Sequence, residues 1–130
     1  MSQPILVETS WYIRLAKTKQ DPLHKLDKVS SFRTLATCGM VMSEVGRGLR
    51  LPNVLKRYQD VWGEMLVIQS TPEVWDRTLE LVWTLDRQGI VLPIQDVHIA
   101  ACALEVSAVV LTYDRHFKLI PDLVVTDCLY

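Results

Sequence analysis

The amino-acid sequence predicts an α/β fold, in which three layers (α/β/α) enclose a central, mostly parallel sheet of about five strands. Short apolar runs alternate along the chain with segments whose apolar residues recur at helical spacing. The chain has 130 residues, of which 49% are hydrophobic and 22% charged, so one domain spanning 1–130 can bury a substantial core. The sequence contains no repeat, low-complexity stretch or long linker.

The first part of the chain predicts two strands and three helices. Residues Pro4–Val7 form a short apolar run typical of a buried strand, and Thr9–Lys17 is predicted to form a helix. A polar break precedes the segment Leu23–Leu35, whose apolar residues at 23, 26, 29 and 32 predict a second helix. Ala36–Val41 is a second strand candidate, broken by Gly39, and Met42–Leu51 continues as a helix that stops at a proline.

The middle of the chain predicts a helix over Asn53–Glu64 and a strand over Met65–Ile68. The next helix starts at Thr71, a hydroxyl cap followed by proline at the first helical position. It should run to Gln88 and end at Gly89.

The last part predicts a buried helix and two strands. Gln95–Ser107 is apolar on nearly all sides, so this helix should be buried, and its alanines allow close packing against a sheet. Val109–Thr112 and Leu123–Thr126 are the fourth and fifth strands. Strands interleaved with helices give a mostly parallel sheet, whose functional site lies at the carboxyl ends of the strands.

Four acids stand beside strongly apolar sequence, at the positions that this rule selects. Glu8 follows the first strand, and Asp114 lies two residues beyond the fourth. Asp96 opens the buried helix, and Glu44 lies on the helix after the second strand. Taken alone, each also fits a helix cap or a solvated charge, and for Asp96 the capping interpretation is equally good.

Four carboxylates at one sheet edge repel each other unless cations neutralise them. Carboxylate oxygens suit Mg²⁺ or Mn²⁺, which also accept phosphate oxygens as ligands. One or two such ions in an acidic cluster are a common device for phosphodiester hydrolysis. The spacing therefore favours a metal site but leaves the structural interpretation open.

Four segments resemble the PIN domain family, and within it the VapC-type toxins of bacterial toxin–antitoxin pairs. The residues Ile5–Ser10 resemble the opening strand with its first acid, and Val41–Gly48 the second acidic segment. Asp96–Ala103 resembles the helix pattern D-x-x-I-A-A-x-A, and Leu111–Phe117 the segment T-x-D-x-x-F. The resemblance covers nearly the whole chain and is carried by the ordered set of segments.

The resemblance implies a PIN-like fold and an endoribonuclease, dependent on Mg²⁺ or Mn²⁺, that acts as the toxin of a type II toxin–antitoxin system. Such proteins are usually cytoplasmic homodimers held silent by a cognate antitoxin protein. By position, the acidic quartet that binds metal and catalyses RNA hydrolysis would be Glu8, Glu44, Asp96 and Asp114. The hydroxyls that help place a water or ligand would be Thr112 and Thr9 or Ser10.

One residue departs from the family pattern, because the first acid is normally aspartate and here it is Glu8. The extra methylene moves the carboxylate outwards by up to roughly 1.5 Å, and octahedral Mg²⁺ tolerates misplaced ligands poorly. Three outcomes follow from this substitution. In the first, the backbone adjusts and the enzyme is active; in the second, activity is weak or shifted towards Mn²⁺; in the third, the protein only binds RNA or protein. The last case defines the alternative function, a catalytically weakened PIN-like binding module.

Four arginines are candidate RNA contacts. Arg47 and Arg50 are three residues apart on the predicted Glu44 helix and would share a face, while Arg14 and Arg115 lie near the proposed acids in sequence. Solvated arginines, or contacts to an antitoxin acid, fit equally well. With a net charge of −1, any grip on RNA must be local and sensitive to salt.

The remaining features mostly predict structural roles. His98 should point away from Asp96 on its helix and serve structure, whereas His116 is a weak candidate for an RNA contact. The stripe of Trp75, Leu79, Val82 and Trp83 predicts core packing, or a dimer or antitoxin surface.

The composition also bears on the class of protein. No membrane span or signal peptide is predicted, so a cytoplasmic protein is expected. Three widely spaced cysteines predict neither a disulfide framework nor a zinc site. A phosphoacceptor receiver domain is disfavoured, because it needs an acidic pair after the opening strand and a late lysine.

Overall fold

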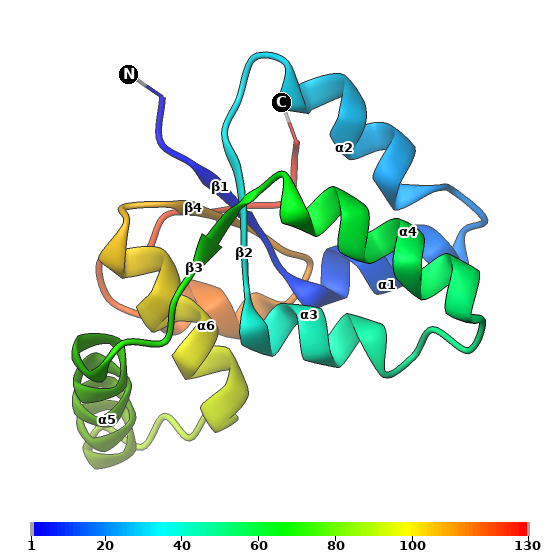
Figure 1. The fold of residues 1–130 in the computed structure, drawn as a ribbon. Helices are drawn as coiled ribbons and strands as arrows, with labels where there is room; N and C mark the ends of the chain where they lie inside the picture. The colour runs from blue at the N-terminus through cyan, green and yellow to red at the C-terminus, as the bar shows by residue number, and fades with distance from the viewer. Residues whose placement is uncertain (1, 130) are drawn as a thin grey trace.

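The computed structural model describes residues 2–129 and contains a parallel five-stranded sheet (Figure 1). The strands follow the order β3-β2-β1-β4-β5, and every neighbouring pair is parallel. Their bounds are Ile5–Val7 for β1, Leu35–Cys38 for β2, Leu66–Ile68 for β3, Val109–Leu111 for β4 and Val125–Thr126 for β5. The predicted sheet is therefore confirmed.

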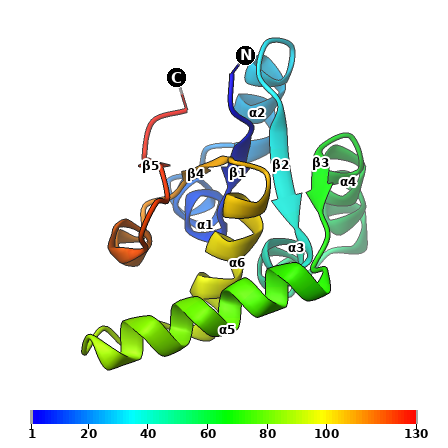
Figure 2. The ribbon, with the colours of Figure 1, turned by 90° about the vertical axis from the view of Figure 1, so that its left-hand side faces the viewer.

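Helices cover both faces of this sheet. Figure 2 shows α5 and α6 in front of the strands, with α1, α2 and α4 behind them. The helices are α1 (Thr9–Lys17), α2 (Pro22–Ser30), α3 (Gly39–Gly46), α4 (Pro52–Gly63), α5 (Pro72–Arg87) and α6 (Ile94–Glu105), followed by a short 3₁₀ helix, η1 (Arg115–Leu119). This arrangement confirms the predicted α/β/α layers.

The buried helix α6 carries the site into the core. Its residues from Asp96 to Ala103 are all buried, as their nearly continuous apolar character predicts. The helix packs against both β4 and α5, so its small side chains allow close approach on two sides. Asp96 is therefore an acid at the start of an otherwise apolar element.

Three predicted boundaries are wrong. The predicted strand Ala36–Val41 ends at Cys38, whose extended backbone caps α3, so the apolar run crosses from strand to helix without a change in hydropathy. The predicted helix Leu23–Leu35 ends at Ser30. The predicted helix Met42–Leu51 ends at Gly46, so Arg47 and Arg50 do not share a helical face.

The exposed stripe of α5 also differs from the core packing that is the default expectation. Trp75, Leu79 and Trp83 are 48%, 64% and 59% exposed. The buried side of the same helix is formed instead by Val74, Thr78 and Leu85. Within residues 2–129, no helix combines the length and the apolar character needed to cross a membrane.

Two glycines predict opposite responses to alanine. Gly89, just beyond α5, has φ of 81°, a conformation that strains any residue with a Cβ, so Gly89→Ala should lower the free energy of unfolding by about 1 kcal/mol. Gly63 ends α4 with open space where a Cβ would lie, so Gly63→Ala should leave stability unchanged or raise it by up to ~1 kcal/mol. Urea denaturation measures both, and equal effects would contradict the assigned backbone.

Candidate functional site

The candidate site lies where the sheet changes its winding direction. From β1 the chain continues to β2 and β3 on one side, whereas β4 and β5 lie on the other. A crevice forms at the carboxyl ends of strands at such a switch point. Here it receives Glu8 from the end of β1, and Thr112 and Asp114 from the end of β4.

Glu8 is buried and fixed by three donors. It caps the start of α1, and its Oε1 accepts hydrogen bonds from Ser10 N at 3.0 Å, Ser10 Oγ at 2.6 Å and Thr112 Oγ1 at 2.6 Å. Burial raises the pKa of Glu8, and the hydrogen bonds from Ser10 and Thr112 partly offset that rise. The carboxylate is thus oriented by hydroxyl groups.

The two hydroxyls are themselves oriented by backbone groups of the loop after β4. Tyr113 N donates to Ser10 Oγ at 3.0 Å, and Asp114 N donates to Thr112 Oγ1 at 2.9 Å. The first bond joins residues 103 positions apart in sequence, and the second is local to the loop. They fix the loop that carries Asp114 against the start of α1.

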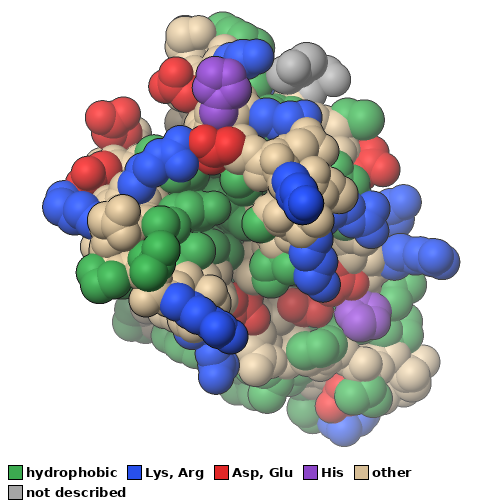
Figure 3. Space-filling view, turned by 90° about the vertical axis from the view of Figure 1, so that its right-hand side faces the viewer, with side chains coloured by type: hydrophobic (Ala, Val, Ile, Leu, Met, Phe, Trp, Pro, Cys, Tyr) green, Lys and Arg blue, Asp and Glu red, His purple; other side chains and the backbone are tan. Residues whose placement is uncertain are grey.

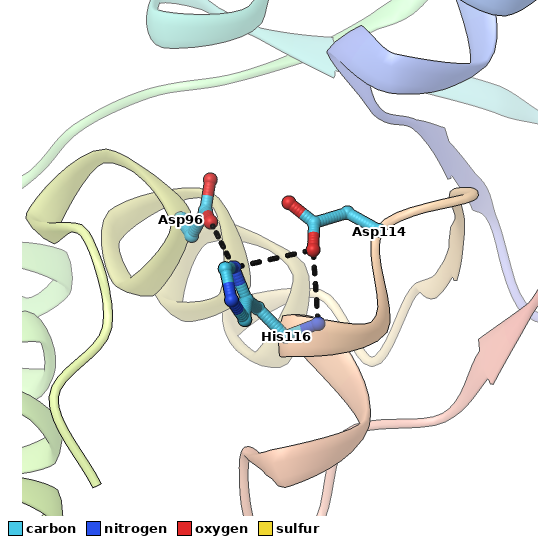
Figure 4. Close-up of side chains that lie close together, drawn as sticks. All are labelled: Asp96, Asp114 and His116. Carbon is cyan, nitrogen blue, oxygen red and sulfur yellow. Dashed lines mark hydrogen bonds and ion pairs between the residues drawn. The ribbon is translucent and has the colours of Figure 1, made fainter.

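Asp96 and Asp114 face each other across the crevice with His116 between them (Figure 4). His116 Nδ1 lies 3.2 Å from Asp114 Oδ1 and 3.5 Å from Asp96 Oδ2. Burial, followed by the negative charges of Asp114 and Glu8, raises the pKa of Asp96 from 3.8 to about 6. Asp96 and Asp114 therefore form a pair whose charges are poorly compensated by protein groups.

Glu44 completes the acidic surroundings from α3. It is half-buried and accepts a hydrogen bond from Thr9 Oγ1 at 2.8 Å. Its charge contributes, as the smallest of several causes, to the raised pKa of Asp96. The four predicted acids thus share one electrostatic environment. Each of the three predicted hydroxyls donates to one of these acids: Thr9 to Glu44, and Ser10 and Thr112 to Glu8.

The acids are not equally close to one another. Within residues 2–129, the one group of three or more candidate ligands whose atoms lie within 4.8 Å of one another consists of Asp96, Asp114 and His116. Glu8 and Glu44 lie outside this group. Two carboxylates and an imidazole form a donor set that suits a divalent cation such as Mn²⁺.

Basic side chains line a surface pocket beside Asp114. Arg14 and Arg115 border it together with Thr112 and Asp114, and Arg14 stacks on the Tyr113 ring at 4.2 Å. Lys118 of η1 lines the same pocket, which sequence reasoning did not predict. Arg47 and Arg50 are exposed at the end of α3 and in the loop before α4.

His98 and His116 have different roles. The predicted structural role of His98 is confirmed, because its ring contacts Ser70 Oγ at 2.8 Å and Thr78 Oγ1 at 3.0 Å and stacks on Trp75. His116 was expected only as a weak RNA contact, yet it lies between two site acids. The one sequence signal for this position of His116 is that it follows Asp114 by two residues. The 3₁₀ helix η1 then directs the chain back towards Asp114.

Comparison with known proteins identifies the family. The PIN domain profile matches residues 5–123 of the chain. The chain belongs to the PIN domain family. The resemblance inferred from the four acidic segments is therefore confirmed at the family level. No curated protein sequence matches the chain at a significant level.

Solved structures of PIN proteins share the fold. VapBC2 from Rickettsia felis, bound to a DNA fragment of its promoter, has a TM-score of 0.77 at 20% identity, covering 95% of this chain and 98% of that one. VapBC-1 from nontypeable Haemophilus influenzae has a TM-score of 0.75 at 22% identity, covering 95% and 97%. VapC20 from Mycobacterium tuberculosis, a toxin that cleaves the sarcin–ricin loop, has a TM-score of 0.60 at 15% identity, covering 88% and 93%.

The raised pKa of Asp96 predicts a pH dependence of stability in chelator. Because folded Asp96 binds its proton more tightly than unfolded Asp96, metal-free stability should fall as pH rises from about 4 through 6. Asp96→Asn removes this charge and should raise the free energy of unfolding at pH 7.5 by about 1–3 kcal/mol. Mn²⁺ should then stabilise the native protein more than the variant.

The matched control for that experiment is Asp86→Asn, which changes an exposed acid on α5. It should alter neither the pH dependence nor the response to Mn²⁺. Thermal denaturation between pH 4 and 8, with and without Mn²⁺, measures both quantities. If Asp96→Asn and Asp86→Asn behaved alike, the crowding of charge at Asp96 would be refuted.

The hydroxyl of Thr112 should contribute measurably to stability. Thr112→Val removes the donor to Glu8 and leaves a buried carboxylate oxygen less satisfied, so it should cost about 1–3 kcal/mol. Thr112→Ser keeps the hydroxyl and should cost less. Denaturant titration of both variants checks this order, and a more stable Val variant would contradict the hydrogen-bond network.

Proposed function

We propose that this protein is an endoribonuclease, the toxin component of a type II toxin–antitoxin system, which hydrolyses RNA phosphodiester bonds with Mg²⁺ or Mn²⁺. The observation that carries the proposal is the facing pair Asp96 and Asp114 in the switch-point crevice. Among residues 2–129, the ion pairs of these two carboxylates are made with His116, a partner that is charged only when protonated. A bound cation would therefore stabilise these two carboxylates by neutralising their charge.

The acidic quartet has a division of labour in this proposal. Asp96 and Asp114 hold the cation, and Glu44 adds negative charge from α3. A bound divalent cation would lower the pKa of a water molecule bound to it and would neutralise negative charge on the phosphate. Glu8 has one oxygen engaged by three donors, which leaves Oε2 to orient the attacking water. Ser10 and Thr112 keep that carboxylate in place.

RNA binding is assigned to the basic residues beside the acids. Arg14, Arg115 and Lys118 line the hollow that adjoins Asp114, so they are placed to contact phosphates that flank the scissile bond. Arg47 and Arg50 are available for more distant contacts from the end of α3. Because the net charge is −1, binding should weaken strongly as salt rises. The substrate class is also supported by the sarcin–ricin loop cleavage of VapC20.

The proposed partners are an antitoxin and a second copy of the chain. An apolar hollow between α1, α3 and α4 is lined by Tyr12, Ile13, Val45 and Leu49, and Figure 3 shows a green hollow with Lys and Arg side chains around it. This surface suits an amphipathic antitoxin segment, and the VapBC complexes among the neighbours support such a partner.

The exposed α5 stripe is assigned to the homodimer. Leu79→Glu should convert a dimer into a monomer, because it places a charge at the centre of the apolar surface. Asp86→Asn, on the same helix, should leave the dimer intact. Analytical ultracentrifugation measures the oligomeric state of both variants. If Leu79→Glu remained a dimer, the α5 stripe would not be the dimer interface.

A second candidate, a catalytically weakened PIN-like module that binds RNA or protein, is favoured by the environment of Glu8. Three donors converge on one oxygen of this longer side chain, and its carboxylate is not part of the compact group formed by Asp96, Asp114 and His116. Glu8→Asp separates the two candidates. A large gain of activity identifies a weakened site, and no gain indicates that glutamate is tolerated.

The proposed activity is tested by incubating the purified protein with RNA in Mg²⁺, in Mn²⁺ and in excess chelator. Cleavage should require the cation, and Asp96→Asn should lower the rate at least about 100-fold, because a ligand of the cation is lost. Asp86→Asn should cleave as the native protein does. Robust cleavage in chelator, or by Asp96→Asn, would sink the proposal.

A further inference from the structure

We propose that His116 is a direct nitrogen ligand of the divalent cation held by Asp96 and Asp114, and that this nitrogen makes the site select Mn²⁺ over Mg²⁺. The inference rests on the proposed metal-dependent function and adds a ligand outside the acidic quartet. His116 supplies the third atom of the compact ligand group in residues 2–129. Figure 4 shows the imidazole directed into the gap between the two carboxylates.

The distances match those between neighbouring ligands of one ion. Metal–ligand bonds of about 2.1–2.2 Å at right angles place two ligand atoms about 3 Å apart. The Nδ1 atom of His116 lies 3.2 Å from Asp114 Oδ1 and 3.5 Å from Asp96 Oδ2. The ligand atoms of all three residues lie within 4.8 Å of one another, so a cation can contact all three with only small side-chain movements.

The histidine is held in this position by its local structure. Asp114 caps η1, and the backbone N–H of His116 donates to Asp114 Oδ1 at 2.9 Å. The next residue, Phe117, is fully buried, so it anchors the short helix to the core. The imidazole is half exposed, which leaves it accessible to an ion from solvent.

Glu8 leaves room for such a ligand. Its Oε1 is engaged by Ser10 and Thr112, and its carboxylate lies outside the compact group. The group thus contains one imidazole nitrogen and carboxylate oxygens from two residues. Imidazole suits transition-metal ions, whereas Mg²⁺ prefers oxygen and water ligands, so the set favours Mn²⁺.

The test is electron spin-echo envelope modulation on Mn²⁺-loaded protein, which detects ¹⁴N bound to the ion. The native protein should show imidazole ¹⁴N coupling, and His116→Gln should lose it and bind Mn²⁺ at least about 10-fold more weakly. His24→Gln is the matched control, because His24 is an exposed histidine on α2. The control should retain both the coupling and the affinity. The third histidine, His98, contacts Ser70 and Thr78 instead.

A second variant covers the case in which His116→Gln fails to fold. His116→Asp replaces the neutral nitrogen ligand with an anionic oxygen ligand, so it should bind both ions and lose the preference for Mn²⁺ measured by Mg²⁺ competition. An unchanged preference in a folded His116→Asp protein would overturn the inference.

The outcomes separate the inference from the proposed function. If native protein binds Mn²⁺ without ¹⁴N coupling, or if His116→Gln keeps native affinity, the nitrogen ligand is refuted. The proposed function then still stands, provided that Asp96→Asn abolishes Mn²⁺ binding. If the native protein binds neither ion, both the ligand and the metal-dependent function fail.

Discussion

The parallel pairing of β1 with β4 brings two distant parts of the chain to the same point in space. Val7 pairs with Leu111, so the residues that follow them, Glu8 and Thr112, meet at the carboxyl edge of the sheet. A hydrogen bond of 2.6 Å between their side chains closes this junction. The position of Asp114, and through it that of His116, depends on the same pairing.

Helix α6 adds a third acid, Asp96, beside this junction, where burial and neighbouring negative charges disfavour its ionised form. Its apolar body lies in the core, so Asp96 at its first turn is held in place with little freedom to move away from the other acids. The raised pKa of Asp96 records the consequence, because burial and neighbouring charges oppose its ionisation. A rigid scaffold thus concentrates negative charge where a cation restores the balance.

The sequence predicts this edge well because a strand end followed by an acid is a local pattern. Glu8 and Asp114 could be located from it, and the nearly continuous apolar character of 97–103 marks α6 as buried. The hydroxyls of Ser10 and Thr112 could be named only through the family resemblance. The bond from Ser10 to Glu8 is a local contact at the start of α1, whereas the bond from Thr112 to Glu8 follows from strand register, which one sequence does not contain.

Other features depend on three-dimensional packing. The start of α3 at Gly39 lies inside a mostly apolar run, so hydropathy does not separate the strand from the helix, and Gly39 is the one local interruption there. Helix α5 has apolar residues on more than one side, and the pattern cannot tell which side faces α6. His116 reaches Asp96 because η1 folds the chain back after β4, a turn that its short sequence does not predict.

If Asp96 and Asp114 hold a divalent cation in the crevice between β1 and β4, crystals of the protein grown with Mn²⁺ should show it in an anomalous difference map. We expect one strong peak about 2.1 Å from carboxylate oxygens of both aspartates. A map with no peak there, while Mn²⁺ binds elsewhere on the surface, would contradict it.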